Sequence, residues 1–494
     1  MSGPVGPQEK QGIWVISVIG ATLHKLRDDA YMADISPDGS QIAFADSNTK
    51  DLWLMNADGS QARSFLKPEP GEYLSYPRWF PSGRRVLYVK YRDERGQARV
   101  SLESRNLKGS DPVVLVSSPD LRSASWAQPG RLLLGIQEPP PHQRDSNLWE
   151  IWYDPETGKP KGAMRRLTDW EGFQFTDVRT TTDAKRLVFL NLHDQSDVYL
   201  GELTNSGSEM KPPQRLTLDD RYDWPTGWSA DSKSIFFYSD LGGAFDIYRQ
   251  AVDAHNPDIL TSGTDDKWAP QLSPDGKWIL YLSWPKPPAG TTDLPPGKLM
   301  RIPISGGPAE FVMDVKGHPS PGFTVGSFPS FRCPMRPGAD CVLSEKGDKQ
   351  LVFTAFDPVQ GRKPQTTKFS ADPDYLAWDL SPDGSRLAIS TFDFKAGDVA
   401  ILPLKAGDAQ KFSVMPWNEL VAIAWRADGK GLFLASFSSR GTSVVTLTLG
   451  SPAKLLWKAV WDVYQLTPSP DGRYLALGPD IIDANAWIAD LPAK

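Results

Sequence analysis

Cysteine and histidine are scarce in this sequence of 494 residues, which has two of the first and five of the second. The histidines lie far apart, and none shows the H-x-x-x-H or H-E-x-x-H spacing that holds zinc on a helix. The nucleophile motif G-x-S-x-G, the phosphate loop G-x-x-x-x-G-K-[ST] and the kinase motifs H-R-D and D-F-G are also missing. The sequence therefore predicts no metal site, no cofactor and no enzymatic activity.

Excess positive charge and long apolar runs are missing too. The formal net charge is −6, and Lys and Arg are scattered, so nucleic acid is not an expected partner. No apolar run approaches the ~20 residues that cross a bilayer. Residues 13–21 (IWVISVIGA) have the length of a signal-peptide core, but they also fit the repeated strand pattern described below. We expect no membrane span in this chain and find no clear signal peptide.

Proline and glycine, by contrast, are abundant, with 44 and 41 residues. The tetrapeptide S-P-D-G occurs at 36–39, 273–276, 381–384 and 469–472, each time before a strand-like run. Pro fixes φ, Asp bonds its own backbone two residues on, and Gly accepts positive φ, so this tetrapeptide closes a tight hairpin. Weaker copies fill the gaps, mostly 43 to 48 residues apart, and place turns at 38, 82, 129, 183, 231, 275, 338, 383, 428 and 471.

Each hairpin is followed by a third strand-like run, such as 51–56, and by a short fourth run, such as 166–168. Four short antiparallel strands at this period are typical of a propeller blade. We predict an all-β fold, a β-propeller of four-stranded antiparallel blades with about ten repeats. Because one ring typically holds about four to eight blades, two tandem propellers are expected, 12–315 and 316–494, with one large ring as the alternative.

The S-P-D-G turns, the run L-W-L-M-N-A-D-G at 52–59 and the R-L-T segments resemble the WD-like propeller repeats of TolB. More narrowly, residues 12–19 and 51–59, the segment 215–220 and the cysteine hairpin resemble the extracytoplasmic propeller regions of bacterial transmembrane serine/threonine kinases and winged-helix regulators. This resemblance implies an extracytoplasmic, periplasmic location and a binding or sensing role, without the kinase or DNA-binding part.

Aromatic residues recur about seven residues before the turn and are the candidate ligand-binding residues. They are Tyr31, Tyr76, Trp224, Trp268, Tyr375 and Tyr464. Rings exposed around a funnel would grip a peptide or sugar by stacking and by burial of area. The alternative is that these rings pack between neighbouring blades, because Trp and Tyr are mostly buried on average.

Cys333 and Cys341 flank a turn-like segment that occupies a hairpin position of the repeat. They are a possible disulfide, which would indicate an oxidising compartment, and two buried thiols are the alternative.

The two ends of the repeat array look complementary. Residues 12–26 resemble third and fourth strands without their first two, and the last repeat ends near 485–488 without a fourth. Either residues 21–26 complete the last blade and close a ring, or the chain is the truncated part of a longer protein, attached to an upstream membrane-anchored domain.

The expected function is that of a non-catalytic binding or sensing module in bacterial envelope signalling, which recognises a protein, a peptide or a glycan. The alternatives are the accessory propeller of a peptidase and an envelope scaffold of the TolB type.

Overall fold

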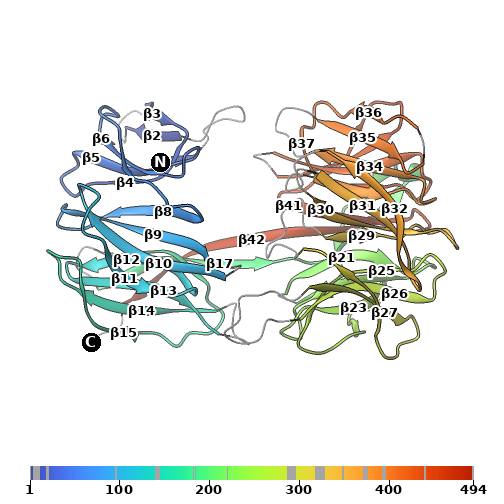
Figure 1. Ribbon diagram of the computed structural model, residues 1–494, viewed down its shortest axis with the longest axis horizontal. Helices are drawn as coiled ribbons and strands as arrows, with labels where there is room; N and C mark the ends of the chain where they lie inside the picture. The colour runs from blue at the N-terminus through green and yellow to red at the C-terminus, as the bar shows by residue number, and fades with distance from the viewer. Residues whose placement is uncertain are drawn as a thin grey trace. The chain divides into compact units, whose positions relative to one another are not determined.

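The computed structural model describes residues 2–3, 12–17, 22–94, 97–139, 145–181, 183, 185–219, 221–285, 296–317, 329–347, 350–370, 376–391, 397–405, 407–438 and 441–491. Contacts divide the chain into two compact units (Figure 1). Unit 1 comprises residues 1–193 and 483–494, and unit 2 comprises residues 194–482.

Unit 2 contains five four-stranded antiparallel sheets whose strands follow one another in chain order. The first two sheets are β21 (Asp223–Trp228), β22 (Ser234–Ser239), β23 (Asp246–Ala251), β24 (Asp258–Ile259) and β25 (Asp266–Leu272), β26 (Trp278–Trp284), β27 (Gly297–Pro303), β28 (Glu310–Val315). The third is β29 (Ser330–Arg332), β30 (Cys341–Gly347), β31 (Gln350–Asp357), β32 (Gly361–Phe369). The last two are β33 (Leu376–Leu380), β34 (Arg386–Thr391), β35 (Asp398–Pro403), β36 (Gln410–Ser413) and β37 (Glu419–Trp425), β38 (Gly431–Phe437), β39 (Ser443–Thr448), β40 (Lys454–Lys458).

A sixth sheet joins the two ends of unit 2. Its inner strands come from the C-terminal part of the chain, β41 (Asp462–Pro468) and the first part of β42 (Tyr474–Asp490). Its outer strands come from the start of the unit, β18 (Tyr199–Thr204) and β20 (Gln214–Arg215), and β19 (Glu209–Met210) forms a hairpin on β18. Strands from both ends of the unit thus share one blade.

Hydrogen bonds between neighbouring blades run around unit 2. The Thr226 hydroxyl donates to the Pro270 carbonyl at 2.9 Å, and the Thr467 hydroxyl donates to the Pro225 carbonyl at 2.9 Å. The second bond joins the sixth blade to the first. Contacts of β25 with β29, β33 with β37 and β37 with β41, and the bond from Trp378 Nε1 to the Ser330 hydroxyl, join the other blades, so the described sheets of unit 2 form a closed ring of six. The prediction of an all-β propeller with four-stranded antiparallel blades is confirmed.

Unit 1 contains three complete blades of the same pattern. They are β4 (Ala30–Ile35), β5 (Gln41–Asp46), β6 (Leu52–Asn56), β7 (Arg63–Leu66); β8 (Glu72–Trp79), β9 (Arg85–Glu94), β10 (Gln97–Asn106), β11 (Val113–Ser117); and β12 (Leu121–Gln128), β13 (Arg131–Gln137), β14 (Ser146–Tyr153), β15 (Pro160–Arg166). Two further sheets have three strands in this unit: β1 (Ser2–Gly3), β2 (Gly12–Ile16), β3 (Leu23–Asp28), and β16 (Phe175–Thr180), β17 (Arg186–Gln195) with β42 beside β17.

Two sequence predictions differ from this topology. The boundary expected near 315 differs from the division at 193/194 because β28 and β29, on either side of it, belong to successive blades of the same ring. Residues 21–26 do not complete the last blade, because β18 and β20 occupy that place, and β3 pairs with β2 in unit 1 instead.

The S-P-D-G turns explain how the first two strands of a blade are joined. In the first copy the Ser36 hydroxyl donates to the Asp38 carboxylate at 2.6 Å, and Gly39 N–H donates to the Ser36 carbonyl at 2.8 Å with φ of +72° at Gly39. Hydroxyl and backbone donors hold the pKa of the Asp38 carboxyl low, at about 2. The turn residues therefore act locally, on their own hairpin.

Replacing the turn glycines by Val should destabilise unit 2, because Gly276 and Gly384 both have φ of +72°. Backbone strain alone should cost about 1–3 kcal/mol. Gly384→Val should cost more than Gly276→Val, since an added Cβ at 384 would lie 3.1 Å from the Pro334 Cγ, whereas a Cβ at 276 meets no atom within 4 Å. Thermal melting checks the order, and an unchanged midpoint for both variants would contradict the turn assignment.

A candidate binding funnel in unit 2

A cavity of about 580 Å³ lies where the inner strands of unit 2 meet their hairpin turns. Every blade of the ring contributes to its lining, through β21, β25, β29, β33, β37 and β41 or the turns that follow them. The cavity is therefore the mouth of the central channel on the side of the S-P-D-G turns. Small ligands of globular proteins usually bind in concave sites of about this size.

Proline dominates the rim of this funnel. The prolines in its lining are Pro274, Pro334, Pro337, Pro382, Pro468 and Pro470. They present ring carbons and carbonyl groups but no backbone N–H. Met335, of which 49% is exposed, adds a flexible apolar side chain to the same rim. The rim thus offers apolar contact together with hydrogen-bond acceptors.

An ion pair lies deeper in the wall. The Arg332 Nε lies 3.2 Å from the Asp379 Oδ1, and the Asp379 Oδ2 accepts the backbone N–H of Trp425 at 2.7 Å. Burial raises the pKa of the Asp379 carboxyl, and the Arg332 charge and the Trp425 N–H oppose this effect. Because three successive blades meet in these contacts, the pair fixes the shape of the wall and places a guanidinium group in it.

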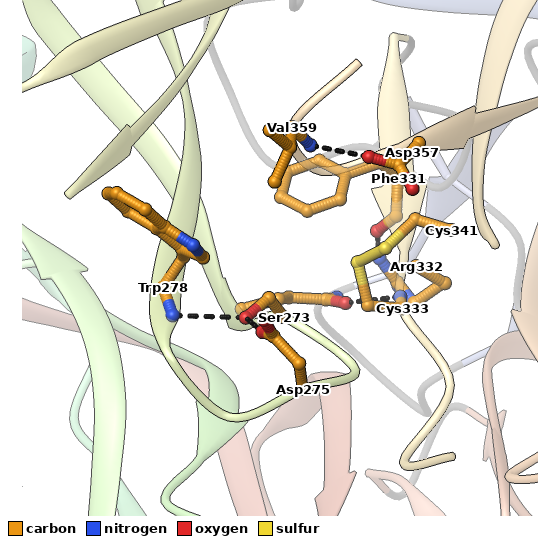
Figure 2. Close-up of a disulfide and its surroundings, with 10 residues drawn as sticks. Ser273, Asp275, Trp278, Phe331, Arg332, Cys333, Cys341, Asp357 and Val359 are labelled. Atoms are coloured by element: carbon orange, nitrogen blue, oxygen red, sulfur yellow. Dashed lines mark hydrogen bonds between the residues drawn. A yellow bond between two sulfur atoms is a disulfide. The ribbon is translucent and has the colours of Figure 1, made fainter. Parts of the chain in front are cut away.

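Gln271 and the cysteine hairpin form the adjoining part of the wall. The Cys333 backbone N–H donates to the Gln271 Oε1 at 2.9 Å, and the sulfurs of Cys333 and Cys341 are bonded at 1.98 Å (Figure 2). Figure 2 also shows the neighbouring S-P-D-G turn, in which the Ser273 hydroxyl donates to Asp275 and accepts from Trp278 N–H. A covalent bond thus ties the β29–β30 hairpin at the edge of the funnel.

The charged groups of this wall are engaged by one another or by neighbouring donors. Arg332 is the only cation among the described residues that line the funnel, against the carboxylates of Asp379 and Asp275. Asp275 is bound by its own turn, where the Ser273 hydroxyl and the Lys277 N–H lower the pKa of its carboxyl against the opposing effect of burial. The funnel therefore does not attract anions, and its polar groups suit a neutral ligand that both donates and accepts hydrogen bonds.

The candidate aromatic residues do not gather around this funnel. Trp224 is fully buried and Tyr31 is 9% exposed, whereas Tyr76 is 44% exposed and lines a smaller cavity of unit 1. Trp268 packs against Tyr238, with ring centroids 5.3 Å apart, and Tyr464 packs edge-on against Phe437 at 4.9 Å. Tyr375 lies outside the described residues. The idea of one accessible aromatic face is wrong for Trp224 and Tyr31, because their rings fill the space between blades.

A bulge in the inner strand explains why the aromatic residues seven positions before the turn do not line the funnel. The pairing of several inner strands shifts between the residue seven before the turn and the residue four before it, as in β25 between Trp268 and Gln271. Several residues that line the funnel lie at the position four before the turn residue, such as Gln271, Asp379 and Thr467. The sequence signal that finds them is this polar position, which the search for aromatic residues passed over.

No group of three or more His, Cys, Asp or Glu residues able to hold a metal ion occurs within the described ranges. In the same part of the chain, no helix is long and apolar enough to cross a membrane.

Comparison with known proteins gives distant relatives. No protein-family model matches the chain. An uncharacterized protein of Agrobacterium fabrum is 26% identical over 243 residues, which cover 46% of this chain and 71% of that protein. An oligogalacturonide lyase of Pectobacterium atrosepticum and an oligogalacturonate lyase of Dickeya dadantii are each 27% identical over 196 and 198 residues. Each match covers 34% of this chain and 48% of the lyase, so the chain spans about half the length of these two relatives.

This similarity corrects one prediction. The missing hydrolase, kinase and zinc motifs led us to expect that the chain is not an enzyme, but two of its curated relatives are named as lyases. The expectation that this chain is not an enzyme rested on absent motifs, and these relatives show that it is wrong.

Solved structures similar to the chain include propellers. A putative TolB from Agrobacterium tumefaciens is 15% identical, with 62% of this chain and 88% of that chain covered and a TM-score of 0.24. The β-propeller domain of the trilobed protease from Pyrococcus furiosus is 15% identical, with coverage of 61% and 86% and a TM-score of 0.27. The fold itself rests on the sheets described above, which make the chain a β-propeller protein.

Proposed function

We propose that unit 2 is a recognition module whose funnel binds a short, uncharged peptide segment of a partner protein. The observation that carries this proposal is the cavity of about 580 Å³, to which all six blades contribute and which combines a proline rim with polar wall residues. An extended peptide offers backbone donors and acceptors to Gln271, Gln465 and Arg332, and it offers an apolar side chain to Met335 and the prolines.

The ion pair of Arg332 and Asp379 favours a neutral ligand over an acidic or a basic one. An acidic ligand would have to compete with Asp379 for Arg332, and a basic ligand would find Asp379 already engaged by Arg332 and by Trp425 N–H. A neutral segment neither competes with Asp379 for Arg332 nor needs the Asp379 carboxylate to be available. A neutral glycan has the same advantage, but it lacks the apolar side chains that the proline rim would contact.

An extracytoplasmic setting fits the disulfide between Cys333 and Cys341, because such bonds persist mainly in oxidising compartments. A role in bacterial envelope signalling, and the narrower resemblance to propeller regions of membrane kinases and winged-helix regulators, belong to this proposal. A TolB-type scaffold or the accessory propeller of a peptidase would also bind protein, and identifying the partner would separate them.

Gln465→Trp should weaken peptide binding, because the larger side chain would occupy part of the funnel that Gln465 lines. Full-length chain is used to select peptides from a random twelve-residue phage library, and the affinities of the selected peptides are measured by calorimetry. We expect predominantly uncharged peptides whose affinity falls at least about tenfold in the variant.

The matched control is Val460→Trp, which adds the same ring to unit 2 at a side chain that is 86% exposed and does not line the funnel. Equal binding by wild type and both variants would place the site elsewhere. Selection of neutral glycans from an array, with no peptide selected, would replace the peptide by a sugar as the ligand.

Lyase activity is the second candidate, favoured by the 27% identity to the oligogalacturonide lyases. A lyase acting on an oligogalacturonide removes a proton from the carbon next to the carboxylate and breaks the C–O bond at the neighbouring carbon. The leaving oxygen takes up a proton, and the product keeps a C=C bond that absorbs ultraviolet light. Incubating the full chain with oligogalacturonide, with and without divalent cations, tests this activity. A rising absorbance that Gln465→Trp abolishes would establish a lyase that uses the funnel, and unchanged absorbance would exclude this candidate.

A further inference from the structure

Unit 1 has a cavity of its own, of about 110 Å³, among the inner strands of its blades. Its lining comes from β8, β9, β10, β12 and β16, which belong to three blades of the unit. It is separate from the funnel of unit 2 in both residues and composition, so an inference about it stands independently of the function proposed above.

Positive charge predominates in this cavity. Among the described residues, Arg78, Arg122 and Arg179 line it, against the single carboxylate of Asp177. Arg122 donates from Nη1 to the carbonyls of Pro119 and Leu121 and from Nη2 to the Gln137 side chain, so part of its donors are engaged and its charge remains in the lining. Burial first, and then the Arg78 charge, lowers the pKa of the Arg179 guanidinium. Two guanidinium groups that repel each other would be stabilised by a shared anion.

The carboxylates near these arginines hold them only loosely. The Arg78 Nη1 lies 3.7 Å from the Asp34 Oδ1, and the Arg179 Nη2 lies 3.8 Å from the Asp177 Oδ1. Both distances exceed hydrogen-bond length, so these pairs are Coulombic contacts. Asp34 is also engaged elsewhere, because its Oδ2 accepts the Trp79 N–H at 2.8 Å. A ligand carboxylate can therefore bond the guanidinium groups without first displacing a short ion pair.

Bulges with positive φ set the backbone conformation of two lining residues. Tyr76 and Asp177 have φ of +49° and +45°, and the pairing of their strands shifts at these positions. Such conformations cost about 1–3 kcal/mol each for residues other than glycine and re-aim the side chain. Tyr76 is 44% exposed and contributes to the lining of the cavity.

The rest of the lining is apolar. Leu87 and Leu102 are each 1% exposed, Leu121 is 6% exposed, and Val89 and Tyr91 pack against the same core cluster. A site with cations on one side and buried aliphatic carbon on the other suits an amphiphilic anion. A volume of about 110 Å³ holds only a few heavy atoms beyond the charged group.

We propose that this cavity of unit 1 binds a small monocarboxylate with a short apolar body, whose carboxylate is held between Arg78 and Arg179 and whose carbon chain lies against Tyr76 and the leucines. Planar guanidinium groups match a carboxylate, and the aliphatic wall selects against fully hydrated anions. Asp177 is the one lining group that opposes the ligand, because its carboxylate competes for Arg179.

The test uses the full chain and butyrate as the probe, with butyramide as its neutral counterpart, and follows saturation-transfer NMR. Butyrate should bind and butyramide should not. Arg179→Gln should weaken butyrate binding about tenfold through the loss of a charge-assisted contact. Asp177→Asn should strengthen it about threefold to tenfold, and Asn tolerates the positive φ of this position.

The gain expected for Asp177→Asn separates binding from a folding defect, since a damaged fold would not improve affinity. Arg84→Gln is the matched control, because Arg84 lies on the same unit outside the lining and should leave binding unchanged. Absence of butyrate binding, equal binding of butyramide, or unchanged affinity in both Arg179→Gln and Asp177→Asn would overturn the proposal. Tighter binding of inorganic phosphate than of butyrate would overturn the monocarboxylate assignment.

Discussion

Asp223→Asn should stabilise unit 2 by about 2–4 kcal/mol at pH 8 and leave its stability nearly unchanged at pH 4. Asp223 is the first residue of β21 and is fully buried. Burial first, and the nearby Asp219 charge second, raise the pKa of its carboxyl to about 7. Asn resembles the protonated carboxyl and carries no charge at any pH.

The sign follows from proton binding. The folded pKa of Asp223 lies above the ordinary value for an unfolded chain, so between about pH 4 and pH 7 the folded state binds more protons than the unfolded state. The stability of the wild type should therefore fall as pH rises through this window. The Asn variant should lose this part of the pH dependence, although Asp219, whose pKa burial also raises, retains its own contribution.

Urea unfolding of both proteins between pH 4 and pH 8 measures this effect. Asp231→Asn is the control, because hydroxyl and backbone donors of its turn lower the pKa of that exposed carboxyl, so its removal should not stabilise unit 2 at pH 8. Equal stability of wild type and Asp223→Asn at pH 8 would show that the carboxylate is accommodated without cost.

Leu477→Ala should destabilise unit 2 by about 2–5 kcal/mol, the range for truncating a fully buried leucine. Leu477 is the residue of β42 that lies between Leu466 of β41 and Tyr199 of β18, strands that are far apart in the sequence. Because this pairing closes the ring, the loss should lower the stability of the whole unit rather than fray one end.

Differential scanning calorimetry checks the result by following the transition of unit 2. Leu455→Ala is the control, since Leu455 lies on the outer strand β40 and is 51% exposed, and it should cost less than about 0.5 kcal/mol. A transition that Leu477→Ala leaves in place would mean that the ring does not depend on the C-terminal strand for closure.

Local signals were enough to predict the blades. Turn chemistry at S-P-D-G and alternation in the flanking runs act within a few residues, and the structure places the turns between first and second strands as expected. The cysteines show the same: Cys333 and Cys341 lie at the ends of one hairpin, and their sulfurs are bonded.

The pairing of strands that are far apart in the sequence could not be predicted from local signals. Nothing local to Tyr199 or Leu477 indicates that they become partners across most of unit 2, because any strand edge of suitable pattern could fill the same place. The aromatic residues were the wrong candidates for a local reason: a bulge of one residue separates partly buried aromatic positions such as Trp268 from funnel-lining positions such as Gln271.

Hydrogen–deuterium exchange of the full chain, with and without a selected uncharged peptide, tests the binding funnel most directly. We expect added protection in the turns and ends of the inner strands of unit 2, around residues 226–230, 271–276, 379–382 and 465–470, with exchange in the outer strands unchanged. Protection confined to outer strands such as β36 and β40, or to unit 1, would contradict binding in the funnel.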